Sequence, residues 1–163
     1  MIADPRPQDG FTLVELLVVV TILSVLALGA TLGAGGVFSR GSDSPRSLAD
    51  SFALAMNSAR DRAVLGRRVI GLYPRPDGWL IAQPLGDDAT WQPISATVSG
   101  LVPGPRWQIA GQPILPGRTP DLAVPPPIRV WPDGRSTAVT AWFGARRDQV
   151  VCATDGWSEV VCE

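Results

Sequence analysis

The 163-residue chain contains no histidine and no lysine, and it has only two cysteines. Without histidine it lacks the usual general base, the usual neutral metal ligand and the side chain that titrates near pH 7. A Ser-His-Asp or Cys-His site cannot be assembled from it, and two cysteines do not complete a zinc site. We therefore expect a protein that is not an enzyme and has no cofactor and no metal.

The charge of the chain is nearly balanced. Its 14 basic residues, all arginine, stand against 15 acidic residues and give a net charge of −1. This balance indicates neither a nucleic acid nor an acidic partner. The 125 residues from 39 to 163 are enough for one compact domain.

The N-terminal part carries a long apolar segment with one carboxylate at its start. Residues 16–38 are uncharged, and these 23 residues would cross a hydrocarbon core of about 30 Å as a helix. Glu15 immediately precedes them. A carboxylate in the bilayer centre costs roughly 2.5–3.5 kcal/mol on insertion scales, so Glu15 is expected to need a cationic partner.

A plausible cleavage site lies before the apolar segment instead of after it. A secretory signal places the small-residue cleavage site last, so that the apolar part is removed. Here Gly10 offers a backbone accessible to a protease, and Phe11 would become the new N-terminus. The order predicts that the apolar helix is retained.

The stretch GFTLVELLVVVTIL resembles the prepilin motif of type IV pilins and type II secretion pseudopilins. This resemblance implies that a prepilin peptidase removes residues 1–10 and methylates Phe11. Residues 11–38 would then be a transmembrane and filament-core helix, and Glu15 would pair with the N-terminal ammonium of a neighbouring subunit. The alternative is an ordinary signal anchor whose Glu15 lies among lipid headgroups.

The soluble part is predicted to begin with an amphipathic helix over residues 45–66. Ser44 is a suitable N-cap and Pro45 fits the first turn. Apolar residues recur at helical spacing. They are Leu48, Phe52, Met56, Ala59 and Ala63. This stripe is more consistent with packing on the domain's own sheet than with a groove for a partner.

From residue 69 onward, short β-rich runs alternate with turn residues, which predicts mostly antiparallel sheet. Three hairpins are expected, pairing 69–73 with 79–83, 128–131 with 135–143, and 149–153 with 157–161. All six tryptophans fall in this part and would supply core volume, although a nucleic-acid or sugar platform is an alternative. The fold class is α+β and pilin-like.

Residues 100–127 contain eight of the sixteen prolines. Proline cannot donate to a strand ladder, so we expect an extended surface connection or an edge in this stretch.

The late segment IRVWPDGRSTAVTAWFG resembles the strand-turn-strand of H-type minor pseudopilins and of FimT-like minor pilins. The first resemblance implies a structural subunit near the tip of the periplasmic pseudopilus of a type II secretion system. Its partners would be other pseudopilins, the prepilin peptidase and the inner-membrane assembly platform. The protein would cross the inner membrane once, with its C-terminal domain in the periplasm.

The second resemblance implies a minor pilin that binds DNA during uptake. Arg146 and Arg147, helped by Arg129 and Arg135, would hold the phosphates. The acidic C-terminal sequence SEVVCE argues against this alternative. Nucleic acid is therefore not the expected partner.

Cys152 and Cys162 are expected to form a disulfide if the domain is exported, with free thiols as the alternative. A two-residue turn at Asp155 and Gly156 would place Cys152 opposite Glu159. The disulfide therefore requires a longer or bulged turn.

Overall fold

The structure is a computed structural model that describes residue 14 and residues 16–22, 38–40, 44–86, 90–98, 100–101 and 103–163. The chain divides into two compact units, Met1–Gly36 and Val37–Glu163. In the first unit Val14 and residues 16–22 are helical. Among the described residues, no helix combines the length and the apolar character needed to cross a membrane.

The second unit contains helix α2, Pro45–Gly66, which occupies the span expected from the sequence. Ser44 caps its first turn, since the Ser44 hydroxyl accepts a hydrogen bond from the Ser47 amide at 3.2 Å. The helix ends where Arg67 adopts a left-handed conformation with φ 47°. Its buried side chains form one stripe: Leu48, Ala49, Phe52, Met56, Ala59 and Ala63.

The first sheet has the order β1-β4-β3-β2-β7. Its strands are β1 Phe38–Arg40, β2 Ile70–Arg75, β3 Gly78–Pro84, β4 Trp91–Val98 and β7 Ile128–Val130. All neighbours are antiparallel except β1 and β4, which run parallel with Phe38 opposite Ala96. Phe38, expected as the last residue of the apolar helix, is therefore a strand residue whose backbone pairs with β4.

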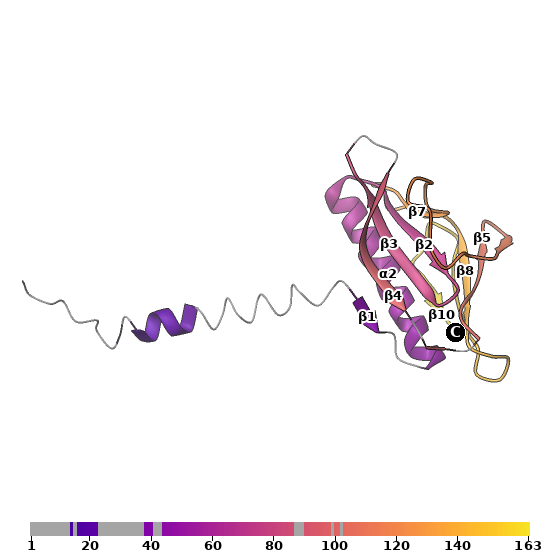
Figure 1. The fold of residues 1–163 in the computed structure, drawn as a ribbon, viewed down its shortest axis with the longest axis horizontal. Helices are drawn as coiled ribbons and strands as arrows, with labels where there is room; N and C mark the ends of the chain where they lie inside the picture. Colours follow the sequence, from indigo (N-terminus) through magenta and orange to yellow (C-terminus); the bar gives the residue numbers. More distant parts are fainter. Residues whose placement is uncertain are drawn as a thin grey trace, which may run out of the picture. The chain divides into compact units, whose positions relative to one another are not determined.

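The second sheet has the order β10-β9-β8-β5-β6 and is antiparallel throughout. Its strands are β5 Arg106–Ile109, β6 Gln112–Ile114, β8 Val139–Phe143, β9 Val150–Thr154 and β10 Val161–Cys162. Helix α2 contacts β2 and β7 of the first sheet and β8, β9 and β10 of the second (Figure 1). The helix therefore joins the two sheets into one domain.

Four aromatic rings meet where the helix and the two sheets come together. Phe52 of α2, Trp79 of β3, Trp107 of β5 and Phe143 of β8 are each at most 2% exposed. Their ring centroids lie 5.4–6.4 Å apart, mostly edge to face. The indole N–H of Trp107 donates to the Arg75 carbonyl at 3.1 Å. This aromatic quartet is the centre of the core.

All three expected hairpins differ from the observed ones. In the third, the last strand is β10, Val161–Cys162, in place of the expected residues 157–161. The first is tighter, since Arg75 pairs with Gly78 across a two-residue turn instead of a five-residue loop. Pro74 is accommodated in β2 because β7 pairs only with Ile70 to Leu72, so no neighbour requires a Pro74 N–H.

The second expected hairpin, 128–131 with 135–143, is mostly wrong. Val130 and Ser136 form an isolated bridge, and the chain then leaves for the other sheet as β8. The last hydrogen bond before the chain leaves the first sheet is made by the Thr137 amide, which donates to the Arg129 carbonyl at 2.8 Å. The Pro-Asp-Gly turn was visible in the sequence, but the change of sheet was not.

The expectation for the proline-rich stretch is also wrong in part. Its proline-free segment, β5, lies between β8 and β6 inside the second sheet. Ala110 and Gly111, both at positive φ, make the tight turn to β6. The prolines stay outside β5, and Pro113 lies in β6, the edge strand, where a missing N–H is tolerated.

Candidate assembly site

The residues that the sequence assigns to processing and docking, Gly10, Phe11 and Glu15, lie outside the described residues. Around them, Val14 and the described apolar side chains of residues 16–22 are 47–70% exposed. The Thr21 hydroxyl donates to the Val18 carbonyl at 2.8 Å, so it is satisfied within the helix. The described helical residues 16–22 therefore present an apolar surface.

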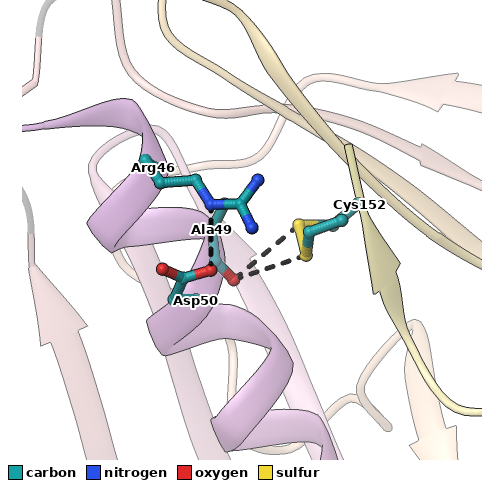
Figure 2. The surroundings of a disulfide bond; sticks show 5 residues. Arg46, Ala49, Asp50 and Cys152 are labelled. Atoms are coloured by element: carbon teal, nitrogen blue, oxygen red, sulfur yellow. Dashed lines mark hydrogen bonds and ion pairs between the residues drawn. A yellow bond between two sulfur atoms is a disulfide. The ribbon is translucent and has the colours of Figure 1, made fainter.

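A disulfide joins Cys152 of β9 to Cys162 of β10. The two residues are directly paired in the sheet, and residues 155–160 connect the strands. The turn is thus longer than two residues, as the disulfide requires. The sulfur atoms of Cys152 and Cys162 lie 3.7 and 3.6 Å from the Ala49 carbonyl oxygen of α2 (Figure 2). The bond therefore sits against the helix and fixes the last strand to the domain.

The connection 155–160 is ordered by the Asp155 side chain. Its Oδ1 accepts hydrogen bonds from the Trp157 amide, the Ser158 amide and the Ser158 hydroxyl at 2.8–2.9 Å. These donors, the Ser158 amide first, lower the pKa of Asp155 to about 2. The turn geometry also depends on Gly156, which has φ 95° and lies so close to the Ser136 carbonyl that a side chain would clash.

Arg60 of α2 ties two loops together. Its Nε donates to the Gly134 carbonyl at 2.9 Å, and its Nη2 donates to the Ser158 carbonyl at 2.8 Å. The helical spacing of the sequence does not reveal this role of Arg60. No local pattern signals it, because the two acceptors are backbone groups 74 and 98 residues away.

The arginines named for DNA contact do not form one surface. Arg146 and Arg147 lie exposed in the turn between β8 and β9, beyond the pair Phe143 and Val150. Arg135 precedes the opposite end of β8, where Val139 pairs with Thr154, roughly 13 Å away along the strands. Arg135 is also bound to Asp133 at 2.6 Å, and Arg129 covers the Trp131 ring.

The N-terminal part of the chain matches a known sequence motif. Residues 5–31 match the prokaryotic N-terminal methylation motif. Together with a helix packed on antiparallel sheets, this motif defines a pilin-like protein of the α+β class, as the sequence predicts.

The particular relatives belong to type II secretion. The chain is 32% identical to type II secretion system protein H of Aeromonas hydrophila over 88 residues, 54% of this chain and 47% of the relative. It is 33% identical to the protein of the same name from Pseudomonas aeruginosa over 115 residues, 68% of this chain and 64% of the relative. The chain thus spans about half to two thirds of the length of these curated relatives.

Two solved structures share the fold. The minor pseudopilin EpsH from the type 2 secretion system of Vibrio cholerae matches with a TM-score of 0.54 and 16% identity, over 74% of this chain and 97% of that one. GspH of Escherichia coli matches with a TM-score of 0.53 and 17% identity, over 72% and 86%. The chain is thus similar in sequence to two type II secretion system proteins H, and its fold is similar to those of EpsH and GspH.

Proposed function

We propose that this protein is a minor pseudopilin, a structural subunit near the tip of the periplasmic pseudopilus of a type II secretion system. The observation that carries the proposal is the combination of two parts in one chain. A methylation motif covers residues 5–31, and the following domain has the fold of EpsH and GspH. Its role would be assembly and not catalysis, in keeping with the absence of histidine.

In the proposed pathway the prepilin peptidase cuts between Gly10 and Phe11 and methylates Phe11. The apolar helix then remains in the inner membrane until the subunit joins the filament. There, Glu15 pairs with the N-terminal ammonium of a neighbouring pseudopilin, because an unpaired carboxylate is costly in an apolar environment. This ion pair would set the axial position of each subunit relative to the next.

The folded domain would lie on the periplasmic side and carry the contacts outside the helical core. The disulfide between Cys152 and Cys162 supports this location, because disulfides persist in oxidising compartments such as the bacterial periplasm. The assembly platform in the inner membrane and the other pseudopilins are the proposed partners.

The proposal is tested with Glu15→Ala and Glu15→Lys in a strain that lacks the natural gene. Both variants are expected to be cleaved and methylated, as read from the N-terminal mass. They are expected to be lost from cross-linked pseudopilin complexes and to reduce secretion. Val14→Ala is the matched control, since it alters the adjacent residue without changing the charge. Normal incorporation of both Glu15 variants would overturn the docking role.

The cleavage step has its own test. Gly10→Val is expected to leave residues 1–10 attached and to keep the protein in the membrane, because a branched side chain obstructs the peptidase at the cleaved bond. An N-terminal mass that shows removal of the leader in this variant would refute the assigned cleavage position.

A further inference from the structure

Two hollows flank one exposed tryptophan at the end of the domain where β9 leads into the 155–160 loop. The first has a volume of about 400 Å³ and is lined by Trp131, Arg135, Ser136, Gly156 and Trp157. The second, of about 440 Å³, is lined by Arg60, Asp133, Gly134, Arg135, Trp157, Ser158 and Glu159. Both hollows share Arg135 and Trp157. The guanidinium carbon of Arg135 lies 5.4 Å from the centroid of the Trp157 ring. The stacked pair therefore forms the wall between two hollows.

The exposed tryptophan is held in a rigid setting. Its side chain is 75% exposed, although its backbone amide is fixed by Asp155. The loop is bound to the neighbouring turn, since the Ser136 amide donates to the Gly156 carbonyl at 2.7 Å. A large ring presented on a fixed backbone loses little conformational entropy when a ligand covers it. The fold thus keeps an aromatic surface exposed where burial would have been more stable.

The lining also contains an unsatisfied hydroxyl. Ser136 is 8% exposed, and its Oγ has no hydrogen-bond partner among the residues that the structure describes. Buried hydroxyl groups are normally paired, and an unpaired one costs about 1–3 kcal/mol. A rotation of the Ser136 side chain toward the first hollow would offer this hydroxyl to a polar ligand.

The charges around the hollows argue against a polyanion. The charged residues that line the second hollow are balanced, with Arg60 and Arg135 against Asp133 and Glu159. Arg135 is neutralised by Asp133 at 2.6 Å, and Arg60 is engaged by two carbonyls. Single-stranded nucleic acids also stack on aromatic rings, but they require a positively charged groove that this surface lacks.

We infer that this surface binds a neutral oligosaccharide. The apolar C–H face of a pyranose ring would cover the exposed part of the Trp157 indole. Sugar hydroxyls would donate to the carboxylates of Asp133 and Glu159 and pair with Ser136. This binding site goes beyond the proposed function and does not depend on assembly into a filament.

The experiment uses the full chain in a zwitterionic detergent, since detergents with sugar headgroups would compete. Titration calorimetry and saturation-transfer NMR are carried out with a tetrasaccharide of β-1,4-linked N-acetylglucosamine and with one of β-1,4-linked glucose. Binding of at least one is expected. Trp157→Ala is expected to weaken it by roughly tenfold, which corresponds to about 1.4 kcal/mol. Trp157→Phe should recover part of the affinity.

Trp142→Ala is the matched control. Trp142 is half-buried and also lies under an arginine, Arg106, but it lines neither hollow. The affinity of the Trp142→Ala variant for the tetrasaccharide should equal that of the unchanged protein. Thermal unfolding should show that all variants fold. Absence of binding to both tetrasaccharides would overturn the inference. An equal loss of affinity in Trp142→Ala would also overturn it. So would binding of a single-stranded DNA oligomer in place of the sugars, or a loss of protein self-association in Trp157→Ala.

Discussion

The Phe52 ring of α2 packs edge-on against the Trp107 ring of β5, with the centroids 5.4 Å apart and the planes at 70°. The helix is thereby attached to the second sheet through a residue that also contacts Trp79 of the first sheet at 5.4 Å. Edge-to-face pairs add about 0.5–1.5 kcal/mol each beyond the burial of apolar area. Phe52 therefore belongs to both interfaces of the helix.

Replacing Phe52 by alanine should lower the free energy of unfolding by about 3–5 kcal/mol, because it removes the central ring of the aromatic quartet and leaves a cavity. Urea unfolding followed by tryptophan fluorescence measures the change. Leu54→Ala on the same helix is the control. Leu54 is 68% exposed, so a shift within about 0.5 kcal/mol is expected. Equal effects of the two substitutions would contradict the assigned core.

Removing the disulfide with Cys152→Ala and Cys162→Ala together should destabilise the domain by about 2–3 kcal/mol, since the unfolded chain regains the entropy of the open loop. Reductant should destabilise the unchanged protein by a similar amount and leave the double variant unaffected. A stable unchanged protein with reactive thiols, detected by alkylation and mass spectrometry, would show that the bond is absent.

Because of Asp155, the stability of the domain should depend on pH in the acid range. Its pKa is about 2 in the folded protein against an ordinary value of 3.8, so the unfolded chain takes up the proton first as the pH falls. The stabilising contribution is complete above about pH 4 and disappears as the pH approaches 2. Asp155→Asn should thus be less stable than the unchanged protein at pH 6, with the gap in melting temperature closing toward pH 2. A gap that stays constant would refute this role.

Arg60→Ala should destabilise the domain by about 1–3 kcal/mol, because two backbone carbonyls on separate loops lose a charged donor. Arg62→Ala is the matched control, since Arg62 is exposed on the same helix. Hydrogen exchange should also become faster in the loops around Gly134 and Ser158. Unchanged exchange in both loops would show that the two hydrogen bonds are not retained in solution.

The alternative of DNA binding gives a distinct result. We expect no gel shift with duplex DNA at about 0.1 M salt, because Arg146 and Arg147 lie at the opposite end of β8 from Arg135. A salt-sensitive shift abolished by Arg146→Ala with Arg147→Ala would contradict this expectation. The exposed pair Arg67 and Arg68, replaced in the same way, controls for a general loss of positive charge.

The elements that the sequence predicts well are those with a local physical signal. Helix α2 follows from the Ser44 cap and from apolar residues at helical spacing, and the resemblance to H-type pseudopilins is confirmed by the relatives in sequence and fold. The tight turn at Ala110 and Gly111 was missed, because the surrounding prolines suggested a surface connection or an edge instead of an inner strand. Prolines limit only the strand positions that they occupy.

The features that sequence reasoning could not find depend on distant partners. The separation of β7 and β8 into different sheets is decided by pairing with β2 on one side and with β5 and β9 on the other. The parallel pairing of β1 with β4 and the anchoring by Arg60 are likewise long-range. A turn signal in the sequence fixes the direction of the chain but not the strand that it meets next.

The bond between Cys152 and Cys162 also affects how readily the domain aggregates before and after the bond forms. Strand β10 has only two residues, yet it covers the outer edge of β9. Before the thiols are oxidised, so short a strand is easily released, and the uncovered backbone of β9 is open to pairing with another chain. Formation of the disulfide would thus act as the step that closes this edge of the sheet against pairing with other chains.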